Sequence, residues 1–441
     1  MENQQKIVNN RMNMFIKGSI IFGIILVLMI PTLLISGLIS ERENRQREAV
    51  WEVSSKWAGQ QTITGAILTI PYYTSPYNAS YDKAELYTFL PEKLEITGHV
   101  KPEKRKRGIF EVVVYNSDIS INGSFNIKNL KIPGIPKEQI MYHKAFLSIG
   151  ISDLRGLQKQ VELKWDDTSS IFQPGAGQNP VLYTGIMSFV NIDSATADGR
   201  DEAIRFSAGL LLKGSEKLYF TPVGKETSIS MTSDWVDPKF NGAFLPTNHT
   251  INDSGFNANW NVLNLNRNYP QSWKGNAYNL NESSFGVDLI VPTDNYQKAS
   301  RSIKYAILVI LLTFIVFFFI EVLNNIHLHL MSYALVGAAL CIFYTLLISI
   351  SEYLNFSISY IIAGFMTIGL ITLYVHSIVR SMRLTSLVFI LLSLLYGFIF
   401  TILQLQDYAL LMGSLGIFII LAILMYFSRK IKTSGTESFN I

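Results

Sequence analysis

The chain has 441 residues and a formal net charge of +4, with 49% hydrophobic and 16% charged residues. Soluble proteins carry about 25% charged residues, so this shortage of charge indicates a membrane protein. The positive balance is too small, and the basic runs are too short, for a protein that follows a nucleic-acid backbone. The sequence has one cysteine, Cys341, which excludes a disulfide bond within the chain.

The first element along the chain is an uncharged apolar run from Gly18 to Ile39. It is long enough for a helix that crosses the hydrocarbon core, which needs roughly 20 residues. Three basic residues precede it: Lys6, Arg11 and Lys17. No small-x-small cleavage site follows, so we expect a cytoplasmic segment over 1–17 and an uncleaved signal-anchor helix over 18–40. Residues 41–56 continue this helix as an amphipathic stalk.

Residues 41–300 are expected to form a β-rich domain. Runs of aromatic and β-branched residues predict strands at 85–90, 109–115, 120–127, 218–220 and 228–232. Asn122-Gly123 indicates a bulge or a tight turn, and Pro222 to Lys225 joins the last two runs as a hairpin. We predict an antiparallel, sandwich-like domain with a short helix near Lys137 to Met141.

Two stretches of this domain resemble binding motifs. The run from Lys101 to Arg107 is strongly basic, but Pro102 and Gly108 bracket it as turn residues. This favours a solvated hairpin loop over a site for nucleic acid or lipid headgroups. Gly209 to Gly214 spaces its glycines like a phosphate loop, yet Ser215-Glu216 stands where Lys-Ser/Thr is required. We therefore predict a strand that ends in a turn.

Residues 301–428 are expected to form a bundle of five membrane-spanning helices. The candidate spans are 303–323, 331–351, 357–379, 384–403 and 408–427. Because the joints between them are short, neighbouring helices must run antiparallel.

Charges in the short joints predict the orientation of the chain. Arg380 and Arg383 share one joint, and three basic residues follow the last span in a tail over 429–441. The positive-inside rule places both segments in the cytoplasm, and six spans place the N-terminus there too. The domain over 41–300 then faces outward.

The sequence contains no recognisable catalytic or metal-binding pattern. The six histidines show no HExxH spacing and one cysteine cannot build a thiolate centre, so no metal or other cofactor is expected. His327 and His329 are predicted to be interfacial loop residues. There is no GxSxG nucleophile elbow. Gly413 to Gly416 lacks a histidine at comparable depth for an intramembrane protease and favours close helix packing instead.

Ionisable residues inside spans deserve scrutiny because burying a charge in the bilayer is costly. Glu321 follows Ile303 by 18 residues (321 − 303), about 27 Å along a helix. This position favours a hydrated charge at the cytoplasmic interface, and His376 is similarly close to the end of its span. The middle of all six spans is uncharged, which disfavours a proton or ion relay.

Several runs, taken together, resemble one protein family. They are Ser152 to Gly156, Phe240 to Pro246, Ser254 to Trp260, Arg301 to Leu308, Phe317 to Glu321, Tyr333 to Gly337, Phe343 to Leu347, and Ser351-Glu352. In this combination the chain resembles the CreD family of bacterial inner-membrane proteins, also called colicin-tolerance (Cet) proteins, over nearly its whole length. Two departures are visible. His329-Leu330 stands where the family usually has His-Pro, and Ser332 where Gln is common, so no role can rest on a proline-fixed turn there.

The resemblance implies membership of an envelope-stress regulon under a two-component system, with effects on envelope integrity and on tolerance to colicins and β-lactams. It implies no enzymatic activity, no catalytic residues and no cofactor. We therefore expect a non-enzymatic inner-membrane protein with a periplasmic domain. Its expected partners are the lipid bilayer and other envelope proteins, and not nucleic acid.

Two alternatives remain open. One is a membrane transporter or lipid-handling protein that uses the five-span bundle, and the other is a receptor whose outward domain binds a ligand. If the outward domain acts, the residues we single out in its turn-rich parts are Asp153, Arg155, Trp235, Phe240 and Trp260.

Overall fold

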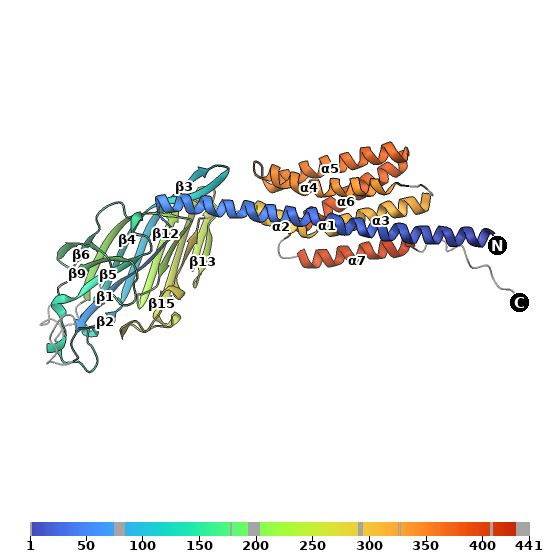
Figure 1. Cartoon of the computed structure of the whole chain (residues 1–441). Coiled ribbons are helices and arrows are strands. Elements are labelled where there is room, and N and C mark those ends of the chain that lie inside the picture. Colours follow the sequence, from blue (N-terminus) through green and yellow to red (C-terminus); the bar gives the residue numbers. More distant parts are fainter. Residues whose placement is uncertain are drawn as a thin grey trace. The chain divides into compact units, whose positions relative to one another are not determined.

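The computed structural model describes residues 2–74, 84–176, 179–192, 203–289, 294–324, 326, 328–405 and 409–428. The chain divides into two compact units (Figure 1). The helical unit comprises residues 1–46 and 293–441, and the β unit comprises residues 47–292. Helix α1 (Glu2–Trp57) contributes residues to both units.

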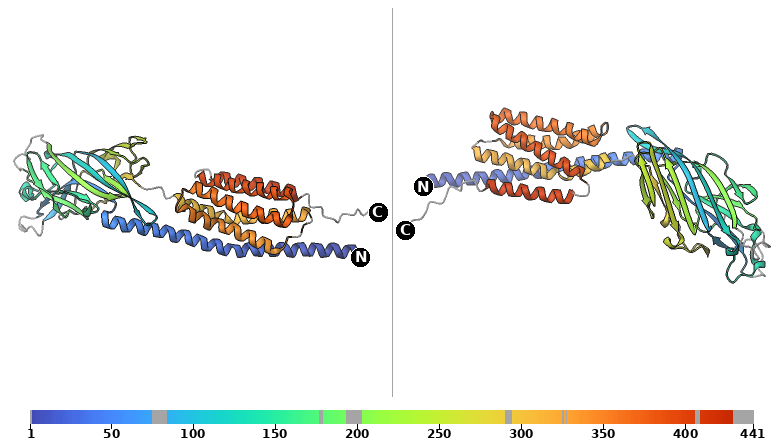
Figure 2. Two further views of the ribbon diagram at one scale, coloured as in Figure 1. Left: turned by 90° about the horizontal axis from the view of Figure 1, so that it is seen from above. Right: turned by 180° about the vertical axis from the view of Figure 1, so that it is seen from behind.

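The helical unit is built from helices that lie side by side, most of them long and apolar (Figure 2). Besides α1 they are α2 (Asp294–Lys304), α3 (Ala306–Asn324), α4 (Leu330–Ser351), α5 (Phe356–Val379), α6 (Met382–Gln404) and α7 (Ala409–Ser428). Among the described residues, parts of α1, α4, α5 and α6 are each long and apolar enough to cross a membrane. Helices α2 and α3 pass the same test together, with a bend of 43° between them. This confirms apolar helices at both ends of the chain.

Local sequence explains how short joints connect these helices. Asn355 caps α5, because its side-chain oxygen accepts a hydrogen bond of 3.1 Å from Ile358 N. At the other end of α5, Arg380 adopts a left-handed conformation with φ of 50° and ends the helix. Helix α1 packs on α4 where a small residue allows close approach. A Cβ on Gly337 would lie 2.2 Å from Leu28 Cδ1.

The β unit contains two sheets. The nine-stranded sheet has the order β13 (Lys239–Gly242), β17 (Phe285–Asp288), β11 (Lys217–Thr221), β1 (Gln61–Tyr72), β5 (Phe146–Ile151), β9 (Gly185–Phe189) and β8 (Gln173–Pro174), with β2 (Glu85–Phe89) on β1 and β16 (Ser272–Lys274) on β2. The eight-stranded sheet has the order β14 (Asn248–Asn252), β15 (Gly255–Leu263), β12 (Glu226–Ser233), β3 (Lys93–Arg107), β4 (Phe110–Asn126), β10 (Ala203–Ser215), β6 (Glu162–Trp165) and β7 (Thr168–Ile171). The expectation of a β-rich domain is thereby confirmed.

One apolar core is shared by side chains of both sheets. Ile67 of β1 and Phe220 of β11 belong to it, as do Ile121 of β4 and Leu210 of β10. Strands such as β12 alternate exposed and buried residues along their length, which is the pattern of a strand with one face on a core. Each fully buried side chain of this kind contributes about 1.5–3 kcal/mol to the stability of the fold. The β unit therefore has an apolar core of its own.

The strand pairing differs from the sequence prediction in two respects. Strands β11 and β12 were expected to form a hairpin, but they belong to different sheets: β11 pairs with β1 and β17, and β12 with β3 and β15. The β1–β11 and β3–β12 pairs are also parallel, so the domain is not wholly antiparallel. Residues 222–225 carry the chain from one sheet to the other.

Two smaller expectations also need correction. Asn122-Gly123 forms neither a tight turn nor a bulge, because both residues lie inside β4 and pair in unbroken register with β10 and β3. The basic run over 101–107 is the end of strand β3 rather than a loop. The hairpin turn follows at Gly108, where φ is +62°. The short helix expected near 137–141 is present as a 3-10 turn, η4 (Lys137–Gln139).

Candidate functional site

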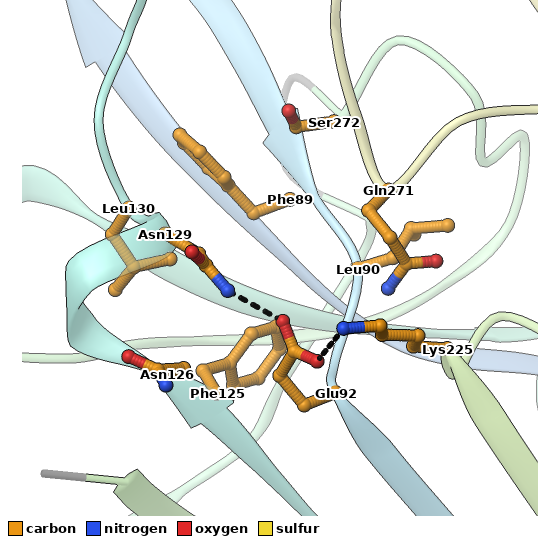
Figure 3. A pocket seen from close by; sticks show the side chains of 10 residues that line it. All are labelled: Phe89, Leu90, Glu92, Phe125, Asn126, Asn129, Leu130, Lys225, Gln271 and Ser272. Atoms are coloured by element: carbon orange, nitrogen blue, oxygen red, sulfur yellow. Dashed lines mark hydrogen bonds and ion pairs between the residues drawn. The ribbon is translucent and has the colours of Figure 1, made fainter. Parts of the chain in front are cut away.

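A cavity of about 280 Å³ lies in the β unit, where β2 ends and β3 begins (Figure 3). Its other walls come from the end of β4, from the 3-10 turn η3 (Ile127–Asn129), and from the segments that precede β12 and β16. Four apolar side chains line it: Phe89, Leu90, Phe125 and Leu130. Six polar residues complete the lining: Glu92, Asn126, Asn129, Lys225, Gln271 and Ser272. The four apolar residues are all buried, whereas Asn129 and Lys225 are exposed, so the mouth lies beside these two.

Backbone hydrogen bonds hold the walls of this cavity together. Leu90 N donates to Gln271 O over 2.8 Å, and Glu92 N donates to Ser124 O over 2.8 Å. Lys225 N donates to Pro91 O over 2.8 Å. Strand β2 ends at Phe89, and Pro91, which follows closely, has no N–H to continue a ladder. The chain crosses here from one sheet to the other.

Glu92 is the electrostatic centre of the cavity. Its Oε1 accepts a hydrogen bond of 2.6 Å from Asn129 Nδ2, and its Oε2 lies 3.1 Å from Lys225 Nζ (Figure 3). The carboxylate and the ammonium therefore neutralise each other. Lys225 remains 53% exposed along its side chain, so its ammonium, which has three donors, keeps hydrogen-bonding capacity toward the cavity.

A buried arginine fixes one wall of the cavity from behind. Arg267 is 8% exposed and donates to Tyr269 O over 2.6 Å, to Val223 O over 3.3 Å and to the side-chain oxygen of Gln271. Gln271 in turn donates through Nε2 to Pro91 O over 3.0 Å. Burial lowers the pKa of Arg267, and among the described residues its Nε has no hydrogen-bond partner. Both polar ends of Gln271 are thereby held in place.

Asp153 and Arg155 lie together, away from this cavity. Asp153 accepts hydrogen bonds from Gly59 N over 2.8 Å and from Arg155 Nη2 over 2.7 Å. Arg155 also donates to Ser55 O, near the end of α1, over 2.5 Å. The Arg155 guanidinium lowers the pKa of Asp153 to about 2, with help from the Gly59 amide. These contacts fasten the end of α1 to the β unit, which is a structural role.

The aromatic residues singled out from the sequence belong to the core of the β unit or pack against it. Phe240 and Trp260 pack with ring centroids 5.7 Å apart, and Trp260 lies 5.8 Å from Phe285, within the core. Trp235 also belongs to the core, and it donates from Nε1 to Asp237 O over 2.8 Å. None of the residues singled out from the sequence lines the cavity.

In the helical unit, Glu321 is buried, whereas the sequence predicted a hydrated carboxylate at the interface. Its carboxylate is paired with Lys17 Nζ and accepts a hydrogen bond of 3.0 Å from Tyr333 OH. Lys17 also donates to Leu328 O over 2.8 Å. Glu321 is only 8% exposed. The sequence prediction missed this because Lys17, from the far end of the chain, supplies the counter-charge and α4 covers the remaining side.

A second ion pair joins α1 to the other end of α4. Arg42 Nε lies 3.3 Å from Glu352 Oε1. Close by, Asn295 of α2 donates to Ser351 O over 3.0 Å and accepts from Phe356 N over 3.1 Å. Helix α1 is therefore held by an ion pair at each end of the bundle.

The histidines do not assemble into a metal site in the part of the chain that the structure describes, where no group of three or more His, Cys, Asp or Glu could hold a metal ion. His329 caps α4, since its Nδ1 accepts from Met331 N over 3.3 Å. His376 lies 3.4 Å from Thr385 Oγ1. His327 falls outside the described residues.

Comparison with known proteins identifies the family of the chain. Residues 13–434 match the model of the family described as inner membrane protein CreD. The chain is 31% identical over 427 residues to the inner membrane protein CreD of Escherichia coli (strain K12), covering 95% of this chain and 93% of that protein. The chain therefore belongs to the CreD family of inner membrane proteins.

Proposed function

We propose that the protein is a non-enzymatic component of the bacterial inner membrane that maintains envelope integrity and gives tolerance to colicins and β-lactams. Membership of the CreD family supports the membrane assignment. In this proposal the β unit, a sandwich of two sheets around one core, works in the periplasm. Its partners are the lipid bilayer and other envelope proteins.

The proposed topology has six spans, with both termini in the cytoplasm. Arg380 and Arg383 border the joint between α5 and α6, and the positive-inside rule assigns this joint to the cytoplasm. Alkaline phosphatase fused after residue 200 should then be active, and a fusion after Arg383 inactive. The reverse pattern would overturn the orientation.

The observation that carries this proposal is the pairing of charges inside the helical unit. Glu321 and Glu352 are each held by a basic residue of α1, Lys17 and Arg42. Charges that neutralise each other in fixed pairs suit a packed anchor better than a relay that must load and release ions. The β unit, with its own core and cavity, is then the part that acts on the envelope.

One observation favours the alternative of a transporter or lipid-handling bundle. Glu321 is buried with a cation and the hydroxyl of Tyr333, and a buried ionisable group in a membrane helix is a functional candidate. If the bundle acts, Glu321→Gln should abolish function while the protein remains folded.

A complementation experiment separates the two. In a strain without its own copy of the gene, residues 301–428 are replaced with one unrelated anchor helix, and survival in colicin and β-lactam is scored. Partial retention of tolerance supports the proposal, as does complete loss when residues 47–292 are removed. Two results would instead assign the activity to the bundle. One is an anchor-swap protein that is present at the normal level but gives no tolerance, and the other is a Glu321→Gln variant that folds but gives no tolerance.

A further inference from the structure

The geometry points to the cavity at Glu92 as a binding site for a neutral saccharide ring. The cavity holds about 280 Å³, just below the roughly 300 Å³ at which small-molecule sites usually begin. This is room for one ring with its substituents, and too little for a peptide segment or a lipid chain. The inference concerns binding in vitro and stands apart from the proposed function.

The lining has the mixed apolar and polar character that a saccharide requires. Phe89, Phe125, Leu90 and Leu130 supply the apolar carbon of the lining (Figure 3). A pyranose ring has faces of C–H groups that pack on apolar carbon, and its hydroxyls project from the rim. Sites of this kind combine apolar walls with a few placed polar groups that fix the orientation of the ligand.

The polar side offers both donors and acceptors. Glu92 is an acceptor, Lys225 is a donor, and the Ser272 hydroxyl has the chemistry of both. Asn129 uses Nδ2 on Glu92, which leaves its amide oxygen as an acceptor at the mouth. Hydroxyl groups donate and accept at once, so a polyhydroxylated ligand satisfies such a mixed rim better than a ligand with one kind of group.

The charges in the lining favour a neutral ligand over an ion. An anion that approaches Lys225 would also meet the Glu92 carboxylate, 3.1 Å from the Lys225 ammonium. A cation that approaches Glu92 would in the same way meet the Lys225 ammonium. The buried Arg267 guanidinium does not line the cavity, because the side chain of Gln271 stands between them. Either ion therefore gains from one partner and loses to the other.

The test uses the full chain in phosphatidylcholine nanodiscs, because maltoside detergents carry a sugar headgroup. The probe is N-acetylglucosamine, followed by saturation-transfer difference NMR. We expect saturable binding with a Kd on the order of 1 mM, the affinity that the ligand efficiency of a single ring gives. Glucosamine and glucuronate, of similar size but charged, should bind at least about tenfold more weakly, because each meets a like charge in the site.

Matched variants locate the binding. Glu92→Gln should weaken it about tenfold through loss of hydrogen bonds to a charged group. Glu85 is the control, because it also accepts from a lysine (Lys274, 2.5 Å) and from a second side chain (Tyr72 OH, 2.6 Å), but it does not line the cavity. Glu85→Gln should bind like the unaltered protein.

Asn129→Ala, at the exposed mouth, gives a second variant if Glu92→Gln does not fold, and it should also weaken binding. Three outcomes would overturn the inference. They are the absence of saturable binding of N-acetylglucosamine, tighter binding of either charged analogue, and equal weakening by Glu85→Gln and the cavity variants.

Discussion

Asp153 joins three segments of the β unit through one residue. Its carboxylate binds the Gly59 amide, just beyond α1, and the guanidinium of Arg155. Its backbone carbonyl accepts from Gln61 Nε2, at the start of β1, over 2.9 Å. Arg155 extends the network to the carbonyl of Ser55, so it satisfies one of the carbonyls that a helix end leaves open.

We expect Asp153→Asn to lower the free energy of unfolding of the β unit by about 1 kcal/mol at pH 7. The effect stays small because Arg155 is 62% exposed and water screens its charge. The folded pKa of about 2 lies below the unfolded value of about 3.9. The contribution is therefore complete above pH about 4 and is lost as the pH falls toward 2.

Unfolding of the full chain can be followed by tryptophan fluorescence. All six tryptophans lie between Trp51 and Trp273, inside the β unit, so the signal reports this unit alone. The difference between the unaltered protein and Asp153→Asn should shrink between pH 4 and pH 2. A difference that stays constant over this range would contradict the assigned role.

The Lys17–Glu321 pair makes a second prediction at the residue scale. Glu321→Ala leaves Lys17 and the Tyr333 hydroxyl without their partner. Removal of one member of a buried ion pair costs roughly 3–5 kcal/mol, and the cost should fall at the low end because Lys17 is partly exposed. We expect α1 to loosen from α4. Exchange of the two charges, Lys17→Glu with Glu321→Lys, should restore part of the contact.

The protein contains a natural reporter of this contact. Cys341 is the one cysteine of the chain. It is buried in α4 with its Sγ 3.8 Å from Leu28 O of α1. Maleimide should label Cys341 faster in Glu321→Ala than in the unaltered protein, and at an intermediate rate in the exchanged pair. Equal rates in all three proteins would show that the ion pair does not hold α1.

Among the elements, β4 and β10 form a long antiparallel pair with aromatic rings laid over glycines. Gly214 of β10 faces Tyr115 of β4, and Gly123 of β4 faces Phe206 of β10. A Cβ on Gly214 would lie 2.2 Å from the Tyr115 hydroxyl oxygen. Tyr115 is fully buried and donates to Lys217 O over 2.7 Å, so its ring has no room to move aside.

Gly214→Val should therefore destabilise the β unit by about 1–3 kcal/mol, the usual cost of overpacking. Gly209 is the matched control, because it lies in the same strand, is exposed and has nothing within 4 Å of its Cβ position. Gly209→Val should be neutral or slightly stabilising, since valine favours strands. Denaturant unfolding followed by tryptophan fluorescence compares the two. Equal losses would refute the packing argument.

Sequence patterns predicted the elements better than their pairing. Hydropathy located α4, α5 and α6 to within a few residues, because lipid and helix geometry impose a local requirement. Residues 222–225 indicated a hairpin, but a turn-like sequence does not specify which strands its neighbours join. The partners of β11 and β12 include β17 and β3, which lie far away in sequence. Parallel pairs need long connections that no local pattern records.

The cavity could not have been predicted for the same reason. Its lining combines residues near 90, 126, 225 and 271, and none of them stands in a recognised motif. Likewise, the sequence showed Glu321 near a helix end but gave no sign that Lys17 would reach it.

For the molecule as a whole, the division into two units predicts that the β unit folds alone. Residues 47–292 contain no cysteine and share one core. Exported without the helical unit, this fragment should be soluble, rich in β structure by circular dichroism and unaffected by reductant. A mainly helical spectrum, or unfolding without cooperativity, would show that the core depends on the membrane helices.

The two ion pairs of α1 also fix the length of helix that lies between them, and this length can be compared with the thickness of the bilayer. Lys17 and Arg42 are 25 residues apart (42 − 17), which is about 38 Å along a helix. The hydrocarbon core of a bilayer is about 30 Å thick. Because α1 is tied to α3 at Lys17 and to the end of α4 at Arg42, the helix cannot slide to follow a thicker or thinner membrane. Mismatch must then be absorbed by tilt of the whole bundle or by deformation of the surrounding lipid.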